Sequence, residues 1–306
     1  MAVIDLARMR RGLDGEAVPE PAAARRKVVE TSAGRRLSYV EAGSGPDVLL
    51  LHGTLTTLDD MRLSVLDVLS RDFHVVAIDR PSRGESDRVR ASDASLWSQA
   101  ETIRDAARVL GLARPVVCGH SYGGAVALAY GMAFPAETAG IVALAPICFP
   151  EPRLEHLLFG PRGMLPFGED LSQGLGASTD AVLLPVLWRA MFLPQAMPPR
   201  FAEHFPFALA GRPEQSVAEG DGANALWSDL ARSALQYGAC RTPVRFLAGA
   251  ADIVVNPYLH SCMAAAVMPA ARIDLLPGIG HMLHHFRRDA VAAAIREVAH
   301  IGRDPG

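Results

Sequence analysis

Short apolar runs alternate with segments of helical spacing along the first half of the chain. Four runs have the length and composition of buried strands: residues 47–51, 73–78, 115–118 and 140–145. Segments with helical spacing follow the first three of them, at residues 59–69, 96–110 and 122–134. Continuous apolar runs suit strands that are buried on both faces of a sheet. The alternation therefore predicts an α/β fold with a doubly wound, mostly parallel sheet.

The alternation stops near Pro146 and resumes about a hundred residues later. Strand-like and helix-like segments then alternate again at residues 244–249, 257–267, 272–276 and 289–299. The stretch between, rich in Pro, Phe, Leu and Met, has helical spacing at residues 180–192, 199–209 and 213–237. We predict a sheet domain of residues 26–147 and 243–306, with residues 148–242 inserted as a helical cap. Residues 1–25 form a polar N-terminal extension, and residues 27–30 and 37–40 a hairpin.

Residues 119–123 read GHSYG and match the pattern G-x-S-x-G. The match stands between a predicted strand and a predicted helix, which is the context that a nucleophilic serine on a sharp turn requires. Gly119, Gly123 and Gly124 remove side chains that would clash in such a turn. Ser121 would lie at the start of a helix, where N–H groups favour a developing anion. We predict that Ser121 is a nucleophile; the alternative is a structural glycine-rich turn with an idle serine.

A serine hydroxyl needs a base to take its proton. His281 follows the last predicted strand and the flexible residues 277–280, and we predict that it is this base. Asp252 follows the preceding predicted strand, where its carboxylate can accept the Nδ1–H of His281 and stabilise the imidazolium. Glu151 is an alternative acid.

The H-x-x-H-H group formed by His281, His284 and His285 has a second interpretation as a metal site. No cysteine or neighbouring carboxylate completes a ligand set in the sequence. We therefore predict no metal and no cofactor, and we expect His284 and His285 to begin the final helix.

Negative charge that develops on a carbonyl oxygen needs preorganised N–H donors. The residue after the nucleophile, Tyr122, should supply one backbone N–H. The loop that follows residues 47–51 should supply the other, and we predict the N–H of Thr54, with Leu55 as the alternative. We expect His52 to have a structural role beneath this loop.

These residues resemble the α/β-hydrolase superfamily from about residue 28 to the C-terminus, apart from most of the insertion. The order Ser121, Asp252, His281 is the one that fold uses. Residues 79–86, DRPSRGES, are similar to its D-x-x-G-x-G-x-S loop, with Ser82 in place of the first glycine. Epoxide hydrolases and haloalkane dehalogenases of this fold use an aspartate nucleophile, so Ser121 argues against both. The resemblance is to the group of serine esterases, C–C hydrolases, proline iminopeptidase-like enzymes and cofactor-free haloperoxidases.

Composition excludes several other classes of protein. The net charge of −3 gives no electrostatic reason to expect nucleic acid as a partner. No apolar stretch approaches the roughly 20 residues of a membrane span. The four cysteines contain no CxxC pair and no signal peptide is present, so we expect a cytoplasmic protein. The sequence does not specify an oligomeric state.

The insertion should cover the site and make it largely apolar. We predict that a small apolar substrate contacts five residues: Leu55, Phe149, Leu187, Trp188 and Met282. The expected reaction is hydrolysis of a carboxylic ester through an acyl-enzyme. Two alternatives are a non-hydrolytic or perhydrolase-type cofactor-free enzyme of the same fold and a catalytically silent ligand-binding protein.

Overall fold

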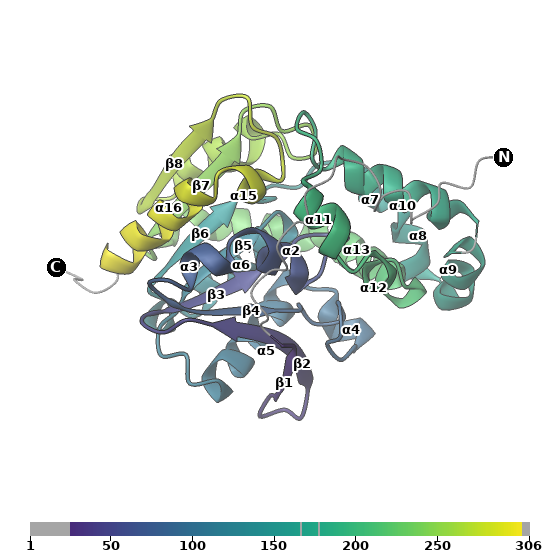
Figure 1. Ribbon diagram of the computed structural model, residues 1–306, viewed down its shortest axis with the longest axis horizontal. Helices are drawn as coiled ribbons and strands as arrows, with labels where there is room; N and C mark the ends of the chain where they lie inside the picture. Colours follow the sequence, from purple (N-terminus) through teal and green to yellow (C-terminus); the bar gives the residue numbers. More distant parts are fainter. Residues whose placement is uncertain (1–24, 166, 177, 302–306) are drawn as a thin grey trace.

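The computed structural model describes residues 25–165, 167–176 and 178–301 of the 306-residue chain. The predicted N-terminal extension, residues 1–25, lies outside the described residues except for its last residue. The described part contains an eight-stranded sheet with helices on both faces, and further helices gathered beside it (Figure 1).

The sheet has the strand order β1-β2-β4-β3-β5-β6-β7-β8. Its strands are β1 (Lys27–Glu30), β2 (Arg36–Ala42), β3 (Asp47–Leu51), β4 (His74–Ile78), β5 (Val116–His120), β6 (Gly140–Leu144), β7 (Val244–Gly249) and β8 (Ala271–Leu276). The pairs β1–β2 and β2–β4 are antiparallel and the other pairs are parallel. The predicted mostly parallel sheet and its N-terminal hairpin are therefore confirmed.

Continuous apolar runs became the central strands because both faces of the sheet are covered. Every residue of β5 and β6 is buried, as are the last four residues of β3. Leu49 and Leu51 pack into the apolar core on one face, whereas Val48 and Leu50 pack into the core on the other. Because the carboxyl ends of parallel strands lie at one edge of the sheet, the loops after β3, β5, β7 and β8 share that edge.

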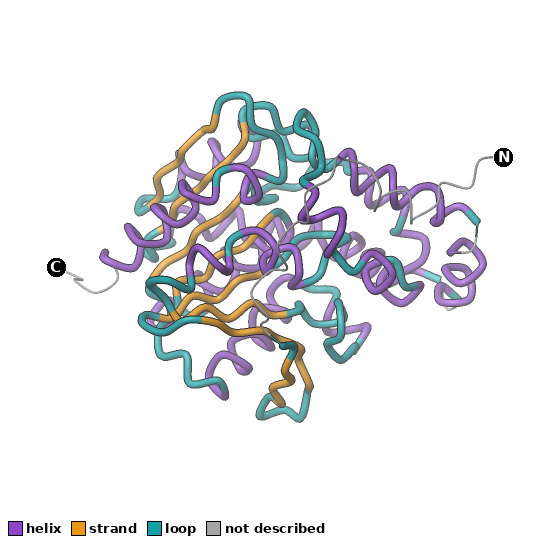
Figure 2. Tube along the Cα trace, in the orientation of Figure 1, coloured by secondary structure: helices purple, strands orange, loops and turns teal. Residues whose placement is uncertain are grey.

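The helices of the sheet domain occupy both faces (Figure 2). They are α2 (Leu58–Ser64), α3 (Leu66–Leu69), α4 (Arg90–Asp93), α5 (Leu96–Val109), α6 (Tyr122–Ala133), α14 (Met263–Val267), α15 (Leu283–Phe286) and α16 (Arg288–Ile301). Short turns of 3₁₀-helix, Pro135–Glu137 and Tyr237–Ala239, and of π-helix, Tyr258–Cys262, complete the set. Buried residues of α5 and α6 belong to one core, and those of α2, α3 and α16 to the other.

The structure corrects one predicted helix start. His284 and His285 do not begin the final helix but lie in the separate short helix α15. Arg287, at φ −124° and ψ 50°, leaves the helical conformation and ends α15 before α16 begins. This break turns both histidine side chains toward the sheet domain, where they meet a carboxylate described below.

Seven helices between β6 and β7 form a group that we call the inserted helices. They are α7 (Leu154–Leu158), α8 (Gly160–Met164), α9 (Gly168–Gly176), α10 (Thr179–Ala190), α11 (Pro199–His204), α12 (Phe207–Ala210) and α13 (Pro213–Gln236). All fall within residues 148–242, and Figure 1 shows them in teal and green beside the sheet. Gly163 and Gly220 allow α8 and α13 to touch, because a Cβ on Gly220 would lie 2.2 Å from the carbonyl oxygen of Phe159. The sequence analysis did not predict α7 to α9, which are short helices of five, five and nine residues, two of them interrupted by glycine.

Candidate active site

Ser121 occupies a strained turn between β5 and α6. Its backbone has φ 54° and ψ −118°, a conformation that residues with a side chain rarely adopt. The chain passes too closely here for other side chains: a Cβ on Gly119 would lie 2.1 Å from the carbonyl oxygen of Gly123, and one on Gly123 would lie 2.3 Å from that of His52. The turn therefore presents Ser121 at the carboxyl edge of the sheet, where it lines a cavity.

His281 and Asp252 meet at the same edge, from the loops after β8 and β7. The Nδ1–H of His281 donates to Oδ2 of Asp252 over 2.7 Å. The other oxygen, Oδ1, accepts the backbone N–H groups of Val254 and Val255 at 2.8 and 2.9 Å. Both carboxylate oxygens are thus fixed, and His281 keeps Nε2 for a second partner. His281 lines the cavity together with Ser121.

Glu151, the alternative acid, has other partners. Its Oε1 accepts a hydrogen bond from Nη1 of Arg153 at 2.6 Å and lies 2.9 Å from Nε2 of His260. Nδ1 of His260 accepts the backbone N–H of Cys148, so the proton of this ring is on Nε2 and points toward Glu151. The geometry therefore favours Asp252 over Glu151 as the partner of His281.

The cavity that contains Ser121 and His281 has a volume of about 480 Å³. One part of its wall is apolar and comprises Leu55, Leu158, Phe159, Leu187, Ala190 and Met191. Another part is polar and includes Glu151, Arg153, Glu155 and Asn256. The site thus combines a largely apolar wall with a few charged groups at fixed positions.

Two of the predicted substrate contacts, Leu55 and Leu187, lie in this wall. The other three do not. Phe149 packs edge-on against Tyr237, with ring centroids 5.6 Å apart, and Met282 is buried among the aromatic side chains of the inserted helices. Trp188 is 2% exposed, and its indole N–H donates to the carbonyl oxygen of Leu55 at 2.9 Å. Trp188 and Met282 belong to the apolar core that the inserted helices share with Leu55, whereas Phe149 packs against a core of the sheet domain, so all three side chains have structural contacts.

Thr54, from the loop after β3, lines the cavity beside Ser121. Tyr122 is the first residue of α6, and N–H groups in the first turn of a helix have no intrahelical partner. Both predicted oxyanion donors thus come from backbone near Ser121. Leu55, the alternative donor, is already engaged: its N–H donates to Oε1 of Glu219 at 3.1 Å.

Arg80, which the sequence analysis did not identify, binds the backbone of the loop that contains Thr54. Its Nε and Nη2 donate to the carbonyl oxygens of His52 and Gly53 at 2.9 and 3.0 Å. Its guanidinium also lies over the Tyr122 ring, 4.6 Å from the centroid. Burial, together with the nearby charge of Arg83, lowers the pKa of Arg80 to about 10, so it stays charged at neutral pH. His52 accepts the backbone N–H of Arg80 on Nε2, in agreement with a structural role.

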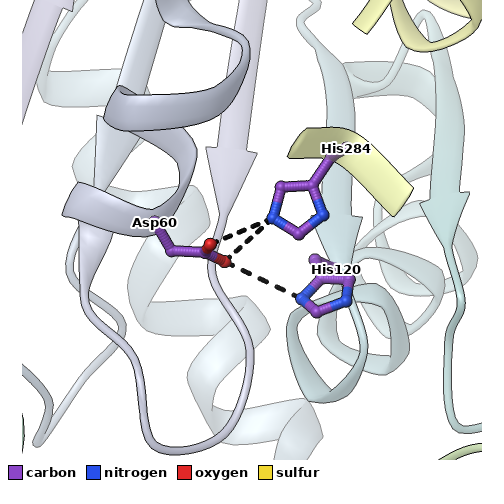
Figure 3. Close-up of side chains that lie close together, drawn as sticks. All are labelled: Asp60, His120 and His284. Atoms are coloured by element: carbon purple, nitrogen blue, oxygen red, sulfur yellow. Dashed lines mark hydrogen bonds and ion pairs between the residues drawn. The ribbon is translucent and has the colours of Figure 1, made fainter. Parts of the chain in front are cut away.

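A second carboxylate–histidine group, shown in Figure 3, includes His120, the residue that precedes Ser121 in the chain. The Nε2–H groups of His284 and His285 donate to Asp60 at 3.0 and 2.8 Å, and Nδ1 of His120 lies 3.8 Å from the same carboxylate. His120 points its other nitrogen, Nε2, at the carbonyl oxygen of His281 at 3.1 Å. We call Asp60, His120, His284 and His285 the buried histidine cluster.

The interior of the protein sets the charges of this cluster. Burial by itself raises the pKa of Asp60, but the interactions with His284 and His285 outweigh it and the pKa lies well below its usual value. Burial lowers the pKa of His285 to about 4, although the hydrogen bond to Asp60 acts in the opposite direction. Burial, His284 and His281 also lower the pKa of His120. An anionic Asp60 is therefore held by hydrogen bonds from His284 and from the neutral ring of His285.

The cluster corrects one premise of the sequence analysis. A carboxylate does accompany the H-x-x-H-H histidines, since Asp60, His120 and His284 each offer a ligand atom within 4.8 Å of the others. It was missed because Asp60 precedes His284 by 224 residues and only the fold brings them together. Hydrogen bonds from His284 and His285 use the oxygens of Asp60, whereas Nδ1 of His120 and Nδ1 of His284 have no hydrogen-bond partner among the described residues.

A mostly parallel sheet in which a serine follows a central strand at a strained turn defines the α/β-hydrolase class. Residues 48–294 match the alpha/beta hydrolase family, and the chain belongs to this family. Among the residues that the structure describes, no helix has both the length and the apolar character to cross a membrane.

Known proteins that resemble the chain carry several activities in their names. An uncharacterized protein of Mycobacterium tuberculosis is 29% identical over 278 residues, which span 83% of this chain and 75% of that protein. Monoacylglycerol lipase abhd6-A of Xenopus laevis is 24% identical over 247 residues, 78% of this chain and 71% of the lipase. The structure of a thermophilic esterase from Thermogutta terrifontis superposes with a TM-score of 0.73 at 21% identity, covering 92% of this chain and all of the esterase.

Proposed function

We propose that the protein is a serine hydrolase that cleaves carboxylic esters with apolar groups. The observation that carries the proposal is the 2.7 Å hydrogen bond from His281 to Asp252 in the cavity that also contains Ser121. A histidine oriented in this way is the base that a serine nucleophile needs. The inserted helices act as a cap, since they supply the apolar wall of that cavity.

The reaction divides into two acyl transfers. Nε2 of His281 takes the proton of Ser121 Oγ while this oxygen attacks the ester carbonyl carbon. The N–H groups of Thr54 and Tyr122 donate to the oxygen on which negative charge develops. The alcohol leaves with the proton of His281, and a water molecule that His281 then deprotonates releases the acid from Ser121. Asp252 stabilises the imidazolium in both halves.

The shape of the cavity supports an ester with an apolar acyl chain. The cavity offers such a chain an apolar surface, formed by Leu158, Phe159, Leu187 and Met191. The burial of each methylene group stabilises the bound substrate by about 0.8 kcal/mol. Two of the similar proteins carry the names lipase and esterase, which agree with this substrate class.

A fluorophosphonate probe tests the nucleophile. We expect wild type and the Ser228→Ala variant, which changes an exposed serine on α13, to be labelled, and Ser121→Ala to remain unlabelled while staying folded. Labelling of Ser121→Ala would show that another residue is the nucleophile. An unlabelled wild type would favour the catalytically silent binding protein.

A series of p-nitrophenyl esters from acetate to laurate tests the substrate. We expect kcat/KM to rise with chain length until the apolar wall is covered. A labelled enzyme that hydrolyses none of these esters would instead favour the non-hydrolytic or perhydrolase-type reaction, which hydrogen peroxide as co-substrate would reveal.

A further inference from the structure

Leu55, directly after the proposed oxyanion donor Thr54, has a backbone conformation that needs support from elsewhere. Its φ of 57° is positive, which is unfavourable for a leucine by about 1 kcal/mol or more. Two residues of the inserted helices bind its two backbone polar groups. Trp188 of α10 donates its indole N–H to the carbonyl oxygen, and Glu219 of α13 accepts the N–H.

Glu219 is fixed by a core arginine. Nε of Arg83 donates to its Oε1 at 3.0 Å, and Nη2 of Arg83 donates to the carbonyl oxygen of Ala218 at 2.7 Å. The side chains of Arg83 and Glu219 are 1% and 4% exposed. A buried pair of this kind is costly to separate, because either charge left alone in the interior has no compensating water. The carboxylate is therefore a rigid acceptor for the N–H of Leu55.

The inserted helices hold the histidine loop in the same manner. Gln195, between α10 and α11, donates its Nε2–H to the carbonyl oxygen of Gly278 at 2.6 Å and accepts the N–H of Gly280 at 2.9 Å. His281 follows directly. The backbone of Leu55 and the backbone just before His281 are thus both hydrogen-bonded to side chains of the insertion.

We propose that Trp188 and Glu219 are positioning residues that set the oxyanion hole through the backbone of Leu55. The inserted helices then complete the catalytic loops as well as cover them. The proposal rests on the proposed serine hydrolase function, and it gives Trp188 a role other than the substrate contact expected from the sequence.

The physical reason lies in the geometry that an oxyanion hole demands. The peptide plane between Thr54 and Leu55 contains the N–H that Glu219 binds, and at the Cα of Thr54 it meets the plane that contains the N–H of Thr54. A tilt of the first plane changes the backbone angles of Thr54 and turns its N–H away from its target. Hydrogen bonds to an oxyanion strengthen in the transition state, so a misdirected donor lowers kcat more than it raises KM. A side chain that merely packs the core would not produce this split.

The first test is Trp188→Phe, which keeps an aromatic ring and removes the N–H donor. We expect kcat for the best p-nitrophenyl ester to fall by between about tenfold and a hundredfold, with KM within about twofold. Trp227→Phe is the matched control, because Trp227 is 48% exposed on α13 and should leave both constants unchanged.

A pair of ketone inhibitors provides a readout that packing alone does not move. The Oγ of Ser121 adds to the carbonyl carbon of a trifluoromethyl ketone of matched chain length, its proton passes to His281, and the carbonyl oxygen becomes an oxyanion in the oxyanion hole. The corresponding methyl ketone binds without this addition, as an analogue of the ground state. We expect Trp188→Phe to lower the affinity for the trifluoromethyl ketone by the same factor as kcat/KM, and to leave the affinity for the methyl ketone unchanged.

Two changes of Glu219 keep the proposal testable if Trp188→Phe folds poorly. Glu219→Gln retains an acceptor oxygen for Leu55, whereas Glu219→Leu removes it, so we expect kcat to fall in the order wild type, Gln, Leu. Glu214→Gln, at an exposed position of α13, is the control. Unchanged kcat and trifluoromethyl ketone affinity in folded Trp188→Phe, or equal kcat in the two Glu219 variants, would overturn the proposal. A wild type that neither turns over nor binds the trifluoromethyl ketone would instead contradict the proposed function.

Discussion

Two carboxylate–histidine groups flank the Ser121 turn, and they differ in access rather than in chemistry. His281 lines the cavity, although its side chain and that of Asp252 are only 2% and 1% exposed, whereas Asp60 and His284 are completely buried and do not line it. His120 stands between them, with its ring 4.7 Å from that of His281 and 4.3 Å from that of His284. A histidine that is oriented by a carboxylate thus becomes a base for substrate only where a reacting atom can reach it.

The buried cluster also shows how an interior anion is tolerated. Burial of an unpaired carboxylate would be strongly unfavourable, and hydrogen bonds from His284 and His285 offset that cost. The same bonds tie α15 to α2, two short helices that follow the loops of His281 and Thr54. We therefore expect the pair of Asp252 and His281 to govern turnover and the buried cluster to govern stability, and three predictions test this division.

The largest effect should come from Asp252→Asn. An amide in place of the carboxylate favours the wrong tautomer of His281, and we expect kcat to fall by about 10⁴-fold, with little change in the midpoint of thermal unfolding. Steady-state kinetics and a thermal melt measure both quantities. Glu151→Gln tests the alternative acid, and we expect a far smaller loss of kcat, because Glu151 pairs with Arg153 and His260 in the cavity wall and not with His281. Equal losses in the two variants would contradict the assignment of Asp252.

Asp60→Asn should act on stability instead. The amide lacks the negative charge that strengthens the hydrogen bonds from both histidines, and its NH2 group can only donate. We therefore expect the free energy of unfolding to fall by about 3 kcal/mol. Chemical denaturation would measure the change, with Asp72→Asn as the control, because Asp72 is exposed and its pair with Arg296 contributes at most about 1 kcal/mol. A stable variant with a large loss of kcat would place the buried cluster in the catalytic machinery.

The third effect is a dependence of stability on pH, which develops gradually below pH 6.5. The ordinary pKa of histidine is 6.5, but burial lowers that of His285 to about 4 in the folded protein. Between these values the unfolded chain binds more protons than the folded protein, so the free energy of unfolding falls as the pH falls, by roughly 3 kcal/mol from this residue. The lowered pKa of His120 also makes the free energy of unfolding fall as the pH falls. The lowered pKa of Asp60 continues this loss of stability below the ordinary pKa of an aspartate.

Denaturant titrations at a series of pH values would measure this slope. We expect His285→Gln, which keeps an N–H donor but no titratable ring, to have a shallower slope between pH 6.5 and about 4 than wild type. The exposed residue His300 provides the control, and His300→Gln should leave the slope unchanged. Identical slopes in wild type and His285→Gln would show that the ring titrates equally in the folded and unfolded states.

Local patterns made the sheet domain predictable. The strand β3 occupies the predicted residues, and the strands β5 and β8 differ from prediction only at their ends, because an apolar run of this length has few ways to be buried except in a covered sheet. The candidate nucleophile, base and acid were also predictable as positions, since each follows a strand and parallel strands end at one edge. Short helices rich in glycine, such as α9 with Gly168, Gly174 and Gly176, were not predicted in this way, because glycine has a low helix propensity.

The sequence by itself determined the order of strands and helices, the strained turn at Ser121 and the membership in a family, because these depend on neighbours in the chain. Tertiary structure alone decided which side chains meet across long separations: Asp60 with His284, Glu219 with Leu55, and Trp188 with the same loop. The physical reason is that hydrogen bonds act over about 3 Å, and only the packing of the inserted helices and α15 onto the sheet domain brings these residues within that distance.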